Sequence, residues 1–241
     1  MYGATSNAEL LLFLLDGSGS MRAQTTDDGR EKCDHLDALV KNVLERLNGS
    51  DKAAAFRIAI IRFGFDAVIE QVNGQSYYTL SDALMVIRPS VTGFAPNEGT
   101  NMVNPIEEAL KIINDFSKDE GIPADKAATV FLFTDGKHNE SLSRELAARE
   151  VMDMVGSLRA SLLSPTVATI SFGADADKDL LLKVSSMANE KQKIRLDNAN
   201  LLDHIIEGHL FLEGHMNDEI TKSKAEVIRN FVVTLSATVK I

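Results

Sequence analysis

Short apolar runs and helical stripes alternate along most of the chain. Residues 10–15 form an uninterrupted apolar run followed by a glycine-containing stretch, which is typical of an interior strand of a parallel sheet. Residues 36–47 carry apolar side chains at spacings of three and four, and Asn48-Gly49 follows, so we expect a helix that ends there. The two patterns recur, with further strands expected at 56–63, 127–134, 166–172 and 194–196 and further helices at 103–116, 141–163, 180–184 and 201–212. This alternation predicts an α/β fold in which a doubly wound, mostly parallel sheet carries helices on both faces.

One part of the sheet is expected to run antiparallel. A second strand is expected at residues 67–72, soon after the strand at 56–63, and the turn sequence Gly64-Phe65-Asp66 separates the two. This pair predicts an antiparallel hairpin at an edge of the sheet. Pro105 lies near the start of the next helix, where its missing N–H is tolerated, and either Asn101 or Asn104 could cap that helix.

The end of the chain follows a different pattern. A polar, helix-like segment leads into strict alternation of apolar and polar residues from Val233 to Ile241, which indicates an amphipathic strand. We therefore divide the chain into a domain at residues 1–214 and a helix–strand extension at residues 215–241. The extension strand either packs on the edge of its own sheet or pairs with the edge of another chain, and the second arrangement would give self-association.

Composition and charge exclude several classes of function. The 241 residues include 25 Lys and Arg against 35 Asp and Glu, and a formal net charge of -10 repels phosphate backbones, so we expect no nucleic-acid partner. Cys33 is the only cysteine, which excludes an intrachain disulfide and a thiolate zinc site and favours a reducing compartment. The apolar run at 10–15 is too short to span a bilayer. We expect a soluble, cytoplasmic protein without a membrane partner.

Polar residues gather in three loops next to the predicted strands, at the edge where open α/β sheets bind ligands. Asp16-Gly17-Ser18-Gly19-Ser20 follows the first strand, Glu98-Gly99-Thr100-Asn101 precedes the helix at 103–116, and Thr134-Asp135-Gly136 closes the strand at 127–134. Two carboxylates and three hydroxyls from these loops form an all-oxygen set, which suits a hard cation. Mg²⁺ is the first candidate, and Mn²⁺ would fit as well.

The three loops resemble the metal-ion-dependent adhesion site (MIDAS) of von Willebrand factor type A domains, written Asp-x-Ser-x-Ser, then Thr, then Asp. The resemblance covers about residues 8–212 and implies the Rossmann-like fold of that family. It also implies the metal ligands, direct or through water, which are Asp16, Ser18, Ser20, Thr100 and Asp135. Among subfamilies, the chain is most similar to stand-alone bacterial intracellular members of the type associated with tellurite resistance.

The chain departs from the family pattern at two places. Met21 and Arg22 follow the motif where integrin β-subunit domains have acidic residues for a second metal, so we expect a single metal ion. Glu98 stands where many members have a glycine. Its carboxylate either hydrogen-bonds to solvent or approaches the metal and occupies the open position.

The rim of the predicted metal site is a candidate for partner recognition. Lys137, His138 and Asn139 come shortly after the predicted ligand Asp135, and Glu98 precedes the loop of Thr100. We expect these four rim residues to contribute to partner selectivity. The alternative is a solvated loop without a role in recognition.

The resemblance implies a non-enzymatic module that binds a partner protein through Mg²⁺, with an Asp or Glu of the partner completing the metal's ligands. Two alternatives stay open. Asp16 could be the nucleophile of a metal-dependent, phosphatase-like hydrolase, although Ser18 stands where such enzymes carry a second acid. The chain could also be a structural subunit that assembles through residues 215–241, with the metal as a staple. Dinucleotide binding is disfavoured because Arg22 occupies the place of the third glycine of that fingerprint.

Overall fold

A five-stranded sheet forms the centre of the computed structural model, which describes residues 7–22, 31–49, 53–87, 99–122, 125–134, 143–171 and 177–185. The strand order is β3-β2-β1-β4-β5. The strands are β1 (Asn7–Asp16), β2 (Phe56–Phe63), β3 (Ala67–Ile69), β4 (Asp125–Thr134) and β5 (Thr166–Ser171). All neighbours pair in parallel except β2 and β3, which pair antiparallel at one edge. The predicted fold class, with its edge hairpin, is confirmed.

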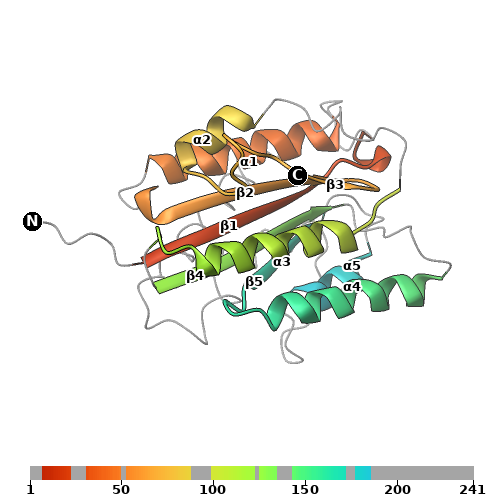
Figure 1. The fold of residues 1–241 in the computed structure, drawn as a ribbon. Coiled ribbons are helices and arrows are strands. Elements are labelled where there is room, and N and C mark those ends of the chain that lie inside the picture. The colour runs from red at the N-terminus through yellow and green to blue at the C-terminus, as the bar shows by residue number, and fades with distance from the viewer. Residues whose placement is uncertain are drawn as a thin grey trace, which may run out of the picture.

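Helices cover the sheet on two sides. In Figure 1, α1 (Lys32–Asn48) and α2 (Leu80–Val86) lie on one face, and α3 (Val103–Lys118), α4 (Arg144–Arg159) and α5 (Lys178–Val184) lie on the other. Two short 3₁₀ turns, η1 (Gly19–Arg22) and η2 (Ala53–Ala55), precede α1 and β2 respectively along the chain. The sheet is therefore doubly wound, as the alternation of strands and helices predicts.

The central strand β1 explains why its sequence shows no alternation of apolar and polar residues. Leu11, Phe13 and Leu15 belong to the apolar core under α1 and α2. Leu10, Leu12 and Leu14 belong to the core under α3, α4 and α5. Because both faces of β1 are buried, every position from 10 to 15 must be apolar, and the apolar run ends at Asp16.

Two local elements differ from the expectation on the β3 side. β3 ends at Ile69, whereas the sequence pattern predicts a strand to residue 72. The chain turns back at Asn73-Gly74, both with positive φ (52° and 77°), and Val72 forms only an isolated bridge with Gln75. Helix α2 was not predicted, because its seven residues bury only Leu80 and Ala83 and so leave no periodic stripe.

The helix expected at 141–163 is shorter in the structure. It begins after Ser143, whose hydroxyl accepts a hydrogen bond from the Leu146 N–H, and it ends at Arg159. Ser164 then adopts a positive φ of 40° directly before Pro165, so the backbone has left the helix. The apolar spacing of the expected helix places Leu146 and Leu162 on its buried face, and this is wrong, since the two residues are 43% and 79% exposed.

The choice between Asn101 and Asn104 at the start of α3 is resolved. The Asn101 Oδ1 accepts hydrogen bonds from the backbone N–H groups of Val103 at 2.9 Å and Asn104 at 3.4 Å, so Asn101 caps the helix. The expected strand at 194–196, helix at 201–212 and extension at 215–241 lie outside the described residues. None of the helices in the described part of the chain combines the length and the apolar character needed to cross a membrane.

Candidate functional site

The carboxylate of Asp16 lies at the carboxyl end of β1 and has no exposed surface (0%). Its Oδ1 accepts a hydrogen bond from the Ser18 N–H at 2.8 Å. Its Oδ2 accepts a hydrogen bond from the Thr134 hydroxyl, at the end of β4, at 2.5 Å. A buried carboxylate needs such donors because it has lost its water, and together they fix its orientation.

The two serines of the first loop (residues 16–22) bring their hydroxyls together. Ser18 Oγ and Ser20 Oγ lie 3.1 Å apart, with Ser18 buried and Ser20 exposed. Behind them the Met21 N–H donates to the Ser18 carbonyl at 3.0 Å, which closes the turn η1. The buried side chain of Met21 packs into the core under α1 and anchors the loop from below.

Thr100 is buried in the second loop (residues 99–102), directly before α3. The next residue, Asn101, holds this loop in two ways. Its side chain caps α3, and its backbone N–H donates to the Gly64 carbonyl at 2.8 Å. The position of Thr100 is therefore set by the helix on one side and by the β2–β3 hairpin on the other.

The hairpin turn (residues 63–66) joins the first loop to the second. Three successive carbonyls of this turn accept hydrogen bonds: Phe63 O from the Gly17 N–H at 2.6 Å, Gly64 O from the Asn101 N–H at 2.8 Å, and Phe65 O from Asn104 Nδ2 at 3.0 Å. The turn thus accepts hydrogen bonds from both sides and fixes the loop of Ser18 relative to the loop of Thr100. Sequence reasoning missed this role, because backbone carbonyls leave no signal in residue types.

The donor set of the described residues fits a small hard cation. Adjacent ligands of an octahedral Mg²⁺, each at about 2.1 Å from the ion, stand about 3.0 Å apart. Ser18 Oγ and Ser20 Oγ show a separation of 3.1 Å. With the buried carboxylate of Asp16 and the buried hydroxyl of Thr100, the donors are all oxygen. The described residues contain no group of three or more His, Cys, Asp or Glu side chains that could hold a metal.

The structure describes some of the predicted site residues and not others. Asp16, Ser18 and Ser20 are linked directly by hydrogen bonds, and the neighbour of Thr100, Asn101, donates to the same hairpin turn as Gly17. The remaining predicted residues, Asp135, Glu98, Lys137, His138 and Asn139, lie outside the described residues. The role of each residue as metal ligand or rim residue stays a prediction.

Thr134 is a site residue whose role sequence reasoning missed. It ends the apolar strand β4 and is buried, and its hydroxyl donates to Asp16. The sequence contains one weak signal, namely a polar residue that closes an apolar strand directly before a predicted ligand. Whether it would meet Asp16 depends on the register of β1 and β4, which pairs Leu15 with Phe133.

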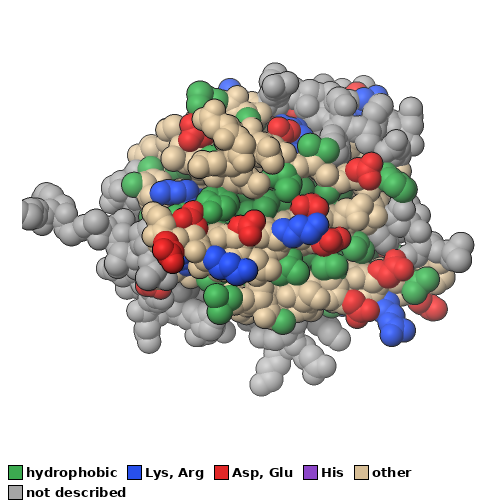
Figure 2. Space-filling view, in the orientation of Figure 1, with side chains coloured by type: hydrophobic (Ala, Val, Ile, Leu, Met, Phe, Trp, Pro, Cys, Tyr) green, Lys and Arg blue, Asp and Glu red, His purple; other side chains and the backbone are tan. Residues whose placement is uncertain are grey.

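The face that carries α3 and α4 mixes both signs of charge (Figure 2). Lys111 Nζ lies 3.1 Å from Glu107 and 3.0 Å from Glu108, and Arg149 Nε lies 3.9 Å from Asp153. Such exposed pairs contribute little to stability, but they neutralise the basic groups locally.

Comparison with known proteins gives a family for this arrangement. The sequence pattern of the von Willebrand factor type A domain matches residues 11–208. No curated protein sequence matches the chain. The match spans most of the chain and includes both loops described above.

Several solved structures share the fold at low sequence identity. The manganese-loaded TRAP protein of Plasmodium vivax is 18% identical, with a TM-score of 0.56 over 79% of this chain and 67% of that one. The mussel byssus proximal thread matrix protein 1, with a zinc-occupied MIDAS motif, is 19% identical (TM-score 0.55) over 75% of this chain and 42% of that one. BatB of Bacteroides thetaiotaomicron is 14% identical (TM-score 0.53) over 94% of this chain and 100% of that one. At these identities the likeness shows the fold alone.

Proposed function

The chain belongs to the von Willebrand factor type A domain family, and on this premise we propose that it is a Mg²⁺-dependent module that binds an acidic residue of a partner protein. Domains of this family are typically non-enzymatic binding modules that mediate protein–protein contacts. The observation that carries the proposal is the first loop, where a buried Asp16 and the paired hydroxyls of Ser18 and Ser20 lie at one strand end.

In the proposed site, each residue of the chain has a separate task. Asp16 and Asp135 supply two negative charges, which balance a divalent cation, and the hydroxyls of Ser18, Ser20 and Thr100 supply neutral oxygens. When bound, Mg²⁺ would provide a Lewis-acidic position that an additional carboxylate can fill. Thr134 and the Ser18 N–H keep Asp16 oriented, so the site is preorganised before the cation arrives.

The environment of Asp16 supports cation binding over hydrolysis. A nucleophilic carboxylate needs an oxygen that can reach a substrate. Asp16 is fully buried, and each of its two oxygens already accepts a hydrogen bond from the protein. A carboxylate buried and oriented in this way suits coordination of a small cation better than the approach of a phosphoester.

Four finer features belong to the proposal. Mg²⁺ is the proposed ion, whereas the solved relatives carry manganese or zinc. Glu98, Lys137, His138 and Asn139 are the proposed rim that selects the partner. We place the protein in a bacterial cytoplasm, as for the stand-alone members related to tellurite resistance, and the extension at residues 215–241 is the proposed site of self-association.

Affinity capture tests the proposal. Purified wild-type protein is immobilised and exposed to a bacterial cytoplasmic lysate in Mg²⁺ or in EDTA, and retained proteins are identified by mass spectrometry. Asp16→Ala removes the central carboxylate, and Asp153→Ala removes an exposed carboxylate on α4 as a charge-matched control. We expect a partner that is retained by wild type and Asp153→Ala in Mg²⁺ and lost in EDTA and with Asp16→Ala. Identical retention in all four conditions would refute metal-dependent recognition.

A further inference from the structure

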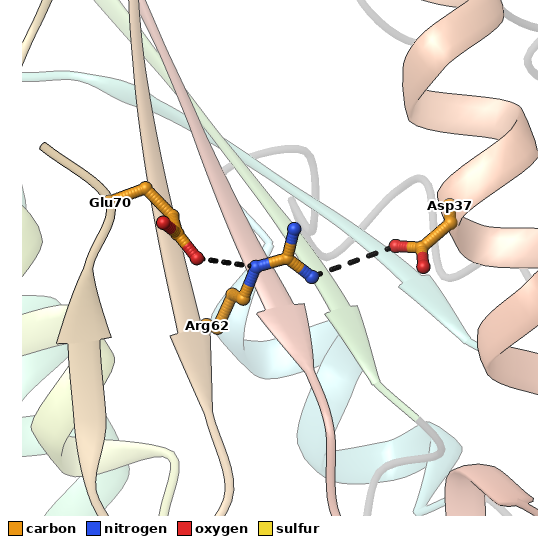
Figure 3. Close-up of polar contacts among 3 residues, drawn as sticks. All are labelled: Asp37, Arg62 and Glu70. Carbon is orange, nitrogen blue, oxygen red and sulfur yellow. Dashed lines mark hydrogen bonds and ion pairs between the residues drawn. The ribbon is translucent and has the colours of Figure 1, made fainter. Parts of the chain in front are cut away.

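The buried cation Arg62 lies between the carboxylates of Asp37 and Glu70, and the three residues belong to three different segments of the chain (Figure 3). Arg62 is the last residue but one of β2. Its Nε donates to Glu70 Oε1 at 2.7 Å, and its Nη1 lies 3.7 Å from Asp37 Oδ1 of α1. The side chains of Arg62 and Asp37 are each 6% exposed, and that of Glu70 is 29% exposed.

The charged group stands where an apolar side chain would be expected. Ile58 and Ile60, the alternate residues of β2 on the same face, belong to the core under α1 and α2. Burying the charges of Arg62 and Asp37 in that core carries a desolvation cost, and replacing buried ion pairs with apolar residues is often neutral or stabilising. Stability alone is therefore a weak reason for this triad, and its place in the fold suggests another role.

The triad of Arg62, Asp37 and Glu70 connects α1 to the β2–β3 hairpin, and both elements contact the first loop. On one side, α1 carries Asp37 and packs against η1, the turn that contains Ser20. On the other side, Glu70 continues the β2–β3 ladder, because its N–H donates to the Ile60 carbonyl at 2.9 Å. Arg62 directly precedes Phe63, whose carbonyl accepts from the Gly17 N–H. The guanidinium thus connects α1, which packs against the turn of Ser20, to the β2–β3 hairpin, whose turn accepts hydrogen bonds from both loops.

From this geometry we infer that Arg62 is a positioning residue for the metal site, holding the hairpin turn in register with the loop of Ser18 and Ser20 through Asp37 and Glu70. The inference rests on the proposed metal-binding function. Arg62 does not touch the cation in this scheme. The buried guanidinium holds Glu70 through a directed hydrogen bond and attracts Asp37 through its charge, which an apolar side chain of similar size cannot do.

Binding of Mn²⁺ alone tests this role without knowledge of the partner. Free and protein-bound Mn²⁺ are distinguished by electron paramagnetic resonance, which gives an affinity, and urea unfolding gives the stability of each variant. Arg62→Met removes the charge at nearly constant volume, and Arg62→Lys restores the charge. Arg57→Met is the matched control, because Arg57 lies at the opposite end of β2 and its guanidinium donates to the carbonyls of Ala54 and Phe56.

We expect Arg62→Met to weaken Mn²⁺ affinity by about tenfold, the lower end of the effect of residues that support metal ligands, and Arg57→Met to leave it unchanged. Arg62→Lys should recover most of the affinity, whatever its effect on stability. If Arg62→Met does not fold, Glu70→Ala decides the question, because the partly exposed Glu70 tolerates truncation and its loss frees one side of the guanidinium. It should also weaken Mn²⁺ affinity.

Two results would overturn the inference and can be told apart. Wild-type affinity in folded Arg62→Met, or in Glu70→Ala, would mean that the triad only supports the fold, and the proposed metal site would stand. A wild-type protein that binds no Mn²⁺, or binds it equally well as Asp16→Ala, would remove the metal site itself and the role of Arg62 with it.

Discussion

The hydroxyl of Thr134 donates a hydrogen bond to Oδ2 of Asp16 at 2.5 Å, although 118 positions separate the two residues in the sequence. They meet because β1 and β4 are parallel neighbours, paired in register up to Leu15 and Phe133. Both residues are therefore the last of their strands and lie at the carboxyl ends of the parallel strands. The bond holds one oxygen of a buried carboxylate that we propose as a metal ligand.

Replacing Thr134 with Val removes this hydrogen bond while keeping the shape of the side chain. We expect Mg²⁺ affinity to fall by about tenfold or more, as is typical when a group that orients a metal ligand is lost. Thr134→Ser keeps the hydroxyl and should bind Mg²⁺ nearly as wild type does. Isothermal titration calorimetry measures both affinities.

The control for this prediction lies on the same strand. The Thr129 hydroxyl donates to the buried Glu9 at 3.0 Å, in the part of β4 away from Asp16. Thr129→Val should lower the free energy of unfolding by about 1–3 kcal/mol, because a buried carboxylate loses a donor, and should leave Mg²⁺ affinity intact. Equal losses of affinity in Thr129→Val and Thr134→Val would argue for a general loosening of the sheet.

Asn101 connects the cap of α3 to the position of Thr100. Asn101→Ala removes the side-chain acceptor for Val103 and Asn104, so we expect a loss of about 1 kcal/mol in the free energy of unfolding and a weaker affinity for Mg²⁺. Thr79→Ala is the matched control, since the Thr79 hydroxyl caps α2 by accepting from the Asp82 N–H at 3.2 Å. Its effect should appear in urea unfolding alone. Unchanged Mg²⁺ affinity in Asn101→Ala would show that the second loop does not need its cap to bind metal.

The sequence predicts the strands and helices well where burial leaves a repeated pattern. β1 is buried on both faces and reads as an unbroken apolar run, and α1 ends at Asn48, with Gly49 as its C-cap, as its stop signal predicts. α2 escapes prediction because a seven-residue helix that buries two side chains leaves no periodicity. Leu162 is misassigned because an apolar residue beyond a helix end can continue its spacing by chance.

The features of the site likewise separate into those that the sequence indicates and those that depend on the tertiary structure. Asp16, Ser18, Ser20, Thr100 and Asp135 are predicted as metal ligands because their types and their order along the chain match a motif. The contacts of Thr134 and Arg62 depend on which strands become neighbours and in which register, so they belong to the tertiary structure. The carbonyls of the hairpin turn could not be found at all, since every residue type has one.

Cys33 should be chemically inert in the folded protein and should make stability sensitive to high pH. Burial, followed by a hydrogen bond to Glu31 Oε2 at 3.2 Å, raises the pKa of this thiol from 9.0 to about 12. Because the folded-state pKa exceeds the unfolded one, the stabilising contribution is fully present below about pH 9 and is lost as pH rises towards 12. Urea unfolding at neutral and alkaline pH should show a fall in stability that is smaller in Cys33→Ala.

The same environment of Cys33 can be checked by its reactivity. Alkylation by iodoacetamide requires the thiolate, so the native protein should react far more slowly than the urea-unfolded protein at about pH 8. Equal rates of alkylation, or an equal alkaline fall in wild type and Cys33→Ala, would contradict the assigned pKa.

The central claim is that Asp16 and the loops around it hold one divalent cation, and titration of Mg²⁺ into the purified protein by isothermal calorimetry tests it most directly. We predict one Mg²⁺ site in wild type and in the charge-matched control Asp153→Ala. We predict its loss in Asp16→Ala and in Asp135→Ala, with circular-dichroism spectra that remain those of the folded protein. Mg²⁺ binding that survives Asp16→Ala, or a folded wild-type protein that binds no Mg²⁺, would contradict the account.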